Sequence, residues 1–214
     1  MLFDFWATLP PQACVHPKDR PILDQYPGIF ELDIPPGHVN GPLKTAPVVA
    51  CYLNPGFEEE DRAWFNREPE RTTLFRQVHG EDGFPLWFPR WRKWYLERVW
   101  DRKRIGEEQL AQTVAIFNVC AYASPNAQQL QPEIIQRLPS SQMARCYLRE
   151  VLIPQAQRGK RFLVIARGHK EWGVDRSLEC RTIRFSPNPR GGHFGKKIRD
   201  AVYDWLDARQ NTET

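Results

Sequence analysis

A continuous run of apolar residues, 47–53, restricts what this chain of 214 residues can fold into more than any other segment. Apolar and polar residues do not alternate in it, so it predicts a strand buried on both faces, as in a parallel sheet. Asn54-Pro55-Gly56 follows directly and ends the strand. The run therefore predicts a sheet that has helices packed on both of its faces.

Three further apolar runs, residues 113–119, 161–166 and 181–185, have the length and composition of strands. Apolar residues recur at helical spacing within residues 91–99, 144–152 and 198–206. Strands that alternate with helices are typical of an α/β fold. We expect a single α/β domain with a central, mainly parallel four-stranded sheet flanked by helices.

The ends of the chain lack these patterns. Residues 1–45 are rich in proline and glycine, so they predict an irregular N-terminal arm packed on the domain. Residues 46–209 form the α/β domain, and residues 210–214 predict a disordered tail.

The composition is that of a soluble globular protein, with 41% hydrophobic and 26% charged residues. No apolar run approaches the roughly 20 residues that span a bilayer, and the N-terminus lacks the basic region of a secretory signal. The five cysteines include no Cys-x-x-Cys pair, which argues against a metal site. We expect a cytoplasmic monomer with no cofactor, no metal and no membrane partner.

Polar, glycine-rich and proline-rich residues follow all four predicted strands. In open parallel sheets, ligands bind beyond the carboxyl ends of the strands. The segments there are residues 54–56, residues 121–126 after Asn118, residues 168–169 and residues 187–193. Their convergence predicts a ligand site at this edge.

Two of these loops resemble motifs of the uracil-DNA glycosylase superfamily, closest to its mismatch-specific uracil- and thymine-DNA glycosylase branch. Leu-Asn-Pro-Gly at residues 53–56 resembles the first motif, and Asn-Pro-Arg-Gly at residues 188–191 resembles the second. Residues 83–91 resemble the aromatic segment and the helix start that lie between the two motifs in this branch. Residues 116–118 resemble the strand end at which the superfamily places a base-reading asparagine. The resemblance covers roughly residues 46–207.

The resemblance implies a monofunctional DNA glycosylase with the uracil-DNA glycosylase-like fold. Such an enzyme flips a deaminated, mismatched or 5-modified pyrimidine out of DNA and hydrolyses its N-glycosidic bond, leaving an abasic site. Its role would be base-excision repair, or antiviral defence if the base is a hypermodified phage base. Asn54 would place the attacking water, while Asn188 and His193 would stabilise the departing base.

Further residues receive base-binding roles from the same resemblance. Asn118 carries both donors and an acceptor, which suits a base edge. Phe84 or Trp87 would stack on the flipped base. Gly56 stands where strict uracil enzymes carry a bulky side chain, so it would admit substituents at C5. Gly192 stands where the branch carries an apolar wedge, which is a departure from the pattern.

The net charge of +4 is compatible with DNA as the partner. We expect DNA contacts from the last loop and the helix after it, where the residues are Arg190, Gly191, Gly192, Lys196 and Lys197. Basic residues also cluster at 90–94 and 102–104, interleaved with tryptophans in the first cluster. A solvated helix face explains each cluster equally well.

Three alternatives remain open on the sequence. Asn54 and Asn188 can act as turn caps, since asparagine before proline is common in turns. The domain can be a DNA-binding module without catalysis, because no residue in the motifs is a strong base. It can also be a hydrolase of small-molecule nucleosides.

Overall fold

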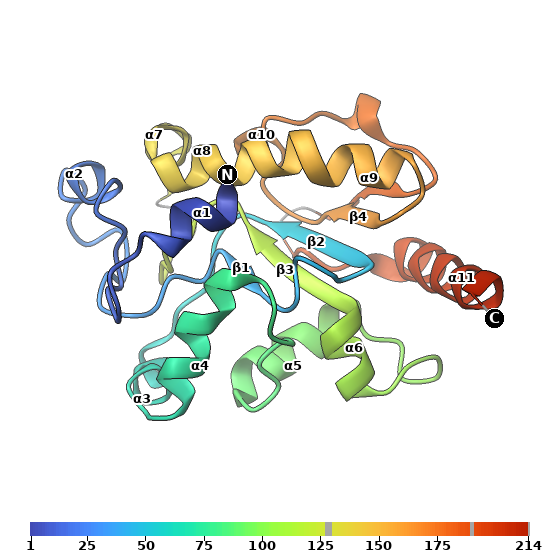
Figure 1. Ribbon diagram of the computed structural model, residues 1–214, viewed down its shortest axis with the longest axis horizontal. Helices are drawn as coiled ribbons and strands as arrows, with labels where there is room; N and C mark the ends of the chain where they lie inside the picture. Colours follow the sequence, from blue (N-terminus) through green and yellow to red (C-terminus); the bar gives the residue numbers. More distant parts are fainter. Residues whose placement is uncertain (127–129, 189–190, 214) are drawn as a thin grey trace.

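The computed structural model has a five-stranded sheet in the order β1–β3–β2–β4–β5 (Figure 1). The structure describes residues 1–126, 130–188 and 191–213. The four expected strands are confirmed, and they run parallel to one another. They are β2 (Val48–Tyr52), β3 (Val114–Asn118), β4 (Phe162–Ile165) and β5 (Ile183–Phe185).

The fifth strand comes from the N-terminal arm. β1 (Val39–Asn40) pairs antiparallel with β3, so the sheet has one strand more than expected. The arm also contains α1 (Leu2–Ala7) and α2 (Arg20–Leu23). The rest of the arm, which lies within the described residues, has no helix or strand, and these three short elements form because they pack on the domain and pair with β3, which the local sequence does not reveal.

Helices cover both faces of the sheet (Figure 1). One face carries α1 together with α7, α8, α9 and α10, and the other carries α5, α6 and α11. Their bounds are α5 (Pro89–Val99), α6 (Glu107–Thr113), α7 (Pro132–Arg137), α8 (Pro139–Tyr147), α9 (Ile153–Gln157), α10 (His169–Trp172) and α11 (Gly195–Glu213). A π-helical turn, η4 (Leu148–Leu152), joins α8 to α9 just before Pro154, whose nitrogen cannot donate a helical hydrogen bond.

One expectation, at the C-terminal end of the domain, changes. Helix α11 continues to Glu213, so the segment after residue 209 is helical where a disordered tail was expected. The stretch between the first motif and residue 81 folds into α3 (Arg62–Phe65) and α4 (Glu70–Arg76), flanked by the 3-10 turns η1 (Glu59–Asp61) and η2 (Gln77–His79). Within the described ranges, no helix is both long enough and apolar enough to cross a bilayer.

The core contains a buried histidine beside β1. The ring of His38 stacks on Trp6 with a centroid distance of 4.2 Å, and neither ring nitrogen has a hydrogen-bond partner among the described residues. Burial lowers the pKa of His38 well below its ordinary value, with a smaller contribution from His79. The folded protein therefore keeps this imidazole neutral in mildly acidic solution.

This histidine predicts a pH-dependent stability. Below about pH 6.5 the unfolded chain binds a proton at His38 and the folded chain does not, so the free energy of unfolding falls as the pH falls. The slope from this group is at most about 1.4 kcal/mol per pH unit. Urea denaturation of wild type and His38→Phe between pH 5 and 7 measures it, and the variant should show a shallower dependence. Equal slopes would contradict the assignment.

Candidate active site

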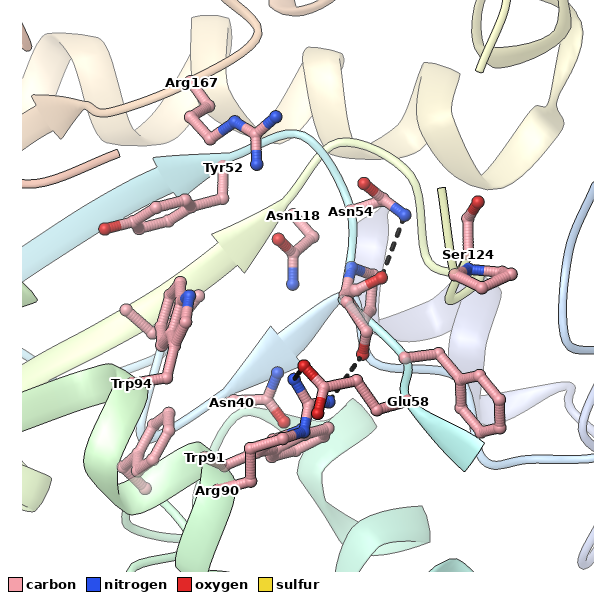
Figure 2. Close-up of a pocket in the computed structure, with 16 residues that line it drawn as sticks. Asn40, Tyr52, Asn54, Glu58, Arg90, Trp91, Trp94, Asn118, Ser124 and Arg167 are labelled. Carbon is pink, nitrogen blue, oxygen red and sulfur yellow. Dashed lines mark hydrogen bonds and ion pairs between the residues drawn. The ribbon is translucent and has the colours of Figure 1, made fainter. Parts of the chain in front are cut away.

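A pocket of about 230 Å³ lies at the carboxyl ends of β2 and β3 (Figure 2). Tyr52 and Asn118, the last residues of these strands, both line it. The other walls come from the loop after β2, from α5 and from Arg167 after β4. The volume lies below the roughly 300–1,000 Å³ of sites for drug-sized ligands, so the pocket suits a ligand no larger than about one nucleobase.

Asn54 lies in the wall of this pocket with one amide atom unengaged. Its Nδ2 donates to the carbonyl of Pro55 at 2.9 Å and to that of Tyr122 at 3.5 Å. Both bonds are made by the amide nitrogen, so Oδ1 is left without a donor among the described residues. A free carbonyl oxygen at this position is able to accept a hydrogen bond from a water molecule or a ligand.

Asn118 lies at the floor of the pocket and is 2% exposed. The N-terminal arm holds it, because its Nδ2 donates to the carbonyl of Gly37 at 2.7 Å and its backbone N–H donates to that of His38 at 2.7 Å. Gly37 also packs against the first motif, where a Cβ on it would lie 2.8 Å from Pro55 Cγ. The absence of a side chain at Gly37 therefore allows the arm to brace both Asn118 and the loop that carries Asn54.

Aromatic rings form the apolar walls of the pocket. Phe84 is buried and stacks on Tyr95 of α5 at a centroid distance of 3.9 Å. Trp91 and Trp94, one helical turn apart on α5, are half-buried and also line the pocket. Trp87 does not line it, and packs instead against Trp64 and Phe88. Of the two candidates for stacking on a base, only Phe84 is in place.

Gly56 lies at the exposed edge of the pocket, where a salt bridge fixes the loop. Arg90 of α5 donates from Nε to Asp61 Oδ1 at 2.6 Å and also bonds the other carboxylate oxygen of Asp61. The same guanidinium donates to the carbonyl of Gly56 at 3.2 Å. Asp61 is 2% exposed, so this ion pair is largely removed from water. It ties the first motif to helix α5.

Asn188 and Gly191, the described residues of the second motif, do not line the pocket. Asn188 is exposed, and its Oδ1 accepts the backbone N–H of Gly191 at 3.2 Å, which is a turn-capping contact. Nor does His193 line the pocket; its carbonyl accepts the hydroxyl of Ser186 at 2.9 Å. The expected meeting of Asn54, Asn118 and Asn188 in one cleft is thus found for the first two only.

The loop of the second motif nevertheless touches the pocket through Tyr52. The Tyr52 hydroxyl donates to the carbonyl of Gly192 at 2.5 Å. Burial raises the pKa of Tyr52, opposed by the nearby Arg98 and Arg167, so the phenol stays protonated and keeps this bond at neutral pH. Gly192 has a φ of +64°, and a Cβ on it would lie 2.6 Å from the Tyr52 ring. No wedge residue fits at this position.

Some residues of the basic clusters have acidic partners. Lys196 pairs with Asp200 at 2.6 Å, and Arg92 with Glu107 at 2.6 Å. Arg104 pairs with Asp204 and Asp207. Lys197 is exposed and forms no ion pair within the described part of the chain, while Arg190 lies outside the described residues. Charge pairing therefore accounts for Lys196, Arg92 and Arg104, and DNA contact by Lys197 stays a prediction.

Two charged residues of the pocket are absent from the sequence-based set. Arg167 follows β4 and Glu58 follows the first motif, and both line the pocket (Figure 2). Arg167 comes two residues after the end of β4, so its position beyond a strand end was the available signal. Glu58 begins the acidic run 58–61, and such a run is typical of the first turn of a helix, so it gives no signal of a pocket.

The pocket has the size of one nucleobase. It combines the hydrogen-bonding side chain of Asn118, aromatic side chains, and Arg167, a cation without an ion-pair partner among the described residues. The described residues contain no cluster of three or more histidine, cysteine or acidic side chains that can hold a metal ion. Such a site can bind a flat, polar heterocycle through its edge and its faces. A scan against protein-family models, a search of the curated proteins and a search of the solved structures find no match to this chain.

Proposed function

We propose that the protein is a monofunctional DNA glycosylase that removes a deaminated, mismatched or 5-modified pyrimidine. The single observation that carries the proposal is the pocket that Asn54, Asn118 and Phe84 line at the carboxyl ends of β2 and β3. A pocket of this size holds one base and not a base pair, so DNA can be its substrate only if the nucleotide is extruded from the helix.

The pocket supplies groups for each demand of the reaction. Breaking an N-glycosidic bond places positive charge on the sugar and negative charge on the base. A water held by the free Oδ1 of Asn54 can attack the sugar from a fixed position. Asn118 binds the edge of the base, and the buried Phe84 covers one of its faces. The site needs no strong base, because the sugar cation is itself reactive toward water.

A panel of oligonucleotides tests the proposal. Single- and double-stranded DNA carrying uracil, mismatched thymine or a 5-substituted pyrimidine is incubated with the protein and then treated with alkali. Strand breaks at the modified position are the expected result. A gel shift without breaks would identify a binding module, and release from free nucleosides alone would identify a nucleoside hydrolase.

Gly56 predicts which bases the pocket accepts. A Cβ on Gly56 meets only Arg90 Nη1, at 3.9 Å, so a larger side chain can be placed there and would project at the mouth of the pocket. Gly56→Tyr should lower the release of 5-substituted pyrimidines about tenfold or more, relative to uracil, because overpacking costs about 1–3 kcal/mol. Gly56→Ala is the matched control and should leave this ratio near the wild-type value. An unchanged ratio in Gly56→Tyr would contradict the assignment.

A further inference from the structure

The pocket holds a guanidinium group that has no partner among the described residues. Arg167 lines the pocket, and its side chain makes no hydrogen bond or ion pair with any of the described residues. Arg90, the other arginine of the pocket, is satisfied by Asp61, Glu58 and the carbonyl of Gly56. An unpaired arginine in a pocket is available for a ligand, since guanidinium binds acceptor oxygens and anions strongly.

Backbone hydrogen bonds and the neighbouring Gly192 position Arg167 in the pocket. Its backbone N–H and that of Ala166 donate to the carbonyl of Cys51 at 3.1 and 2.9 Å, which fixes the start of the side chain at the edge of β2. Its stem passes over Gly192, where a Cβ would lie 3.1 Å from Arg167 Cδ. A side chain at residue 192 would therefore collide with both Tyr52 and Arg167. The glycine at the wedge position makes room for the arginine.

A second cation, Arg98, lies near Arg167. Arg98 lies close enough that Arg167 contributes to lowering its pKa, after the larger effect of burial. Arg98 is held over the Trp94 ring at 4.7 Å, and its one ion-pair partner among the described residues is Glu97, at 3.9 Å. This end of the pocket thus has a surplus of positive charge, and an anionic ligand is favoured there.

We propose that Arg167 is a catalytic residue that stabilises the negative charge on the departing base. This inference rests on the proposed glycosylase function. In the reaction the C1′–N1 bond breaks and its electron pair stays on the base. The water oxygen bonds to C1′ and loses a proton to solvent, and the base anion takes a proton from solvent. The guanidinium interacts more strongly with the anion than with the neutral base, so it lowers the barrier.

The geometry favours Arg167 over Asn188 and His193 as the residue that stabilises the departing base. Asn188 is exposed and caps its own loop, and His193 does not line the pocket. Arg167 is in the pocket and carries a full charge. A charged donor is about twice as strong as a neutral one.

Binding of a free base tests the proposal without requiring turnover. The probe is 5-fluorouracil, an acidic pyrimidine, titrated into the protein below and above the pH at which it ionises. Wild type should bind the anion at least tenfold more tightly than the neutral base. Arg167→Gln should lose that preference and Arg167→Lys should keep part of it. The matched control, Arg158→Gln on an exposed turn, should behave as wild type.

Kinetics give a second readout on an oligonucleotide that wild type cleaves. Arg167→Gln should slow single-turnover base release about 10²-fold, and the loss should be smaller for 5-fluorouracil than for uracil, because the better leaving group needs less help. An anion preference that is absent in wild type, or unchanged in Arg167→Gln, would overturn the inference. A wild type that prefers the anion but cleaves no oligonucleotide of the panel would instead remove the proposed function.

Discussion

Replacing Asn54 with alanine should slow base release about 10²–10³-fold while DNA binding stays near the wild-type level. The reason is the free Oδ1 of Asn54, which we expect to place a water molecule at the transition state and to contribute little before it. Single-turnover release and a gel shift on the same oligonucleotide measure the two quantities separately. Asn54→Asp should retain more activity than Asn54→Ala, because a carboxylate orients water and stabilises the sugar cation.

The control for this variant is Asn211→Ala, an exposed asparagine near the end of α11. It should release base at the wild-type rate. Full activity of Asn54→Ala would show that the side chain only caps its turn through the carbonyl of Pro55. Equal losses of binding and release would show that Asn54 holds the substrate and does not act in the chemical step.

The second large effect concerns stability. Arg90→Met should lower the free energy of unfolding by about 3 kcal/mol, because it leaves the carboxylate of Asp61, which is 2% exposed, without its counter-charge. The first motif should also loosen, since Arg90 no longer bonds the carbonyl of Gly56. Urea denaturation at neutral pH measures the loss.

The double variant Arg90→Met, Asp61→Leu separates charge from packing. Without the buried carboxylate, most of the lost stability should return, because an apolar pair in place of a buried ion pair is often neutral. Base release should remain impaired in the double variant, since the anchor of Gly56 is still missing. A double variant as unstable as Arg90→Met would mean that the stem of Arg90, and not its charge, supports the fold.

The parallel sheet is predictable from the sequence because continuous apolar runs mark strands buried on both faces. β1 is not, since two residues carry no pattern and their pairing with β3 joins segments more than 70 positions apart. The same limit applies to α1, whose burial depends on the distant α8. Local signals therefore identify four strands of the sheet, including the edge strand β5, and miss the other edge strand, β1.

A site residue could be predicted from the sequence where it lies at the end of a strand or just beyond it. Asn54 and Asn118 were found in this way, and Gly56 and Phe84 were placed by motif resemblance. Asn188 and His193 follow β5 as well, but their loop turns along Tyr52 and leaves both side chains outside the pocket. The direction of a loop depends on tertiary packing, which a motif does not encode. Arg167 was overlooked because a single arginine after a strand has no distinctive pattern.

The bracing of the site by the N-terminal arm has a consequence for how the chain folds during synthesis. The arm leaves the ribosome before the segments on which it packs: Gly37 and His38 accept hydrogen bonds from Asn118, and the Phe3 ring packs on Tyr147 at 5.4 Å. Until about residue 147 has emerged, these early residues have nothing to pack on, and their aromatic rings stay exposed to water. The pocket therefore closes late in synthesis, when the arm docks onto a sheet that forms after it.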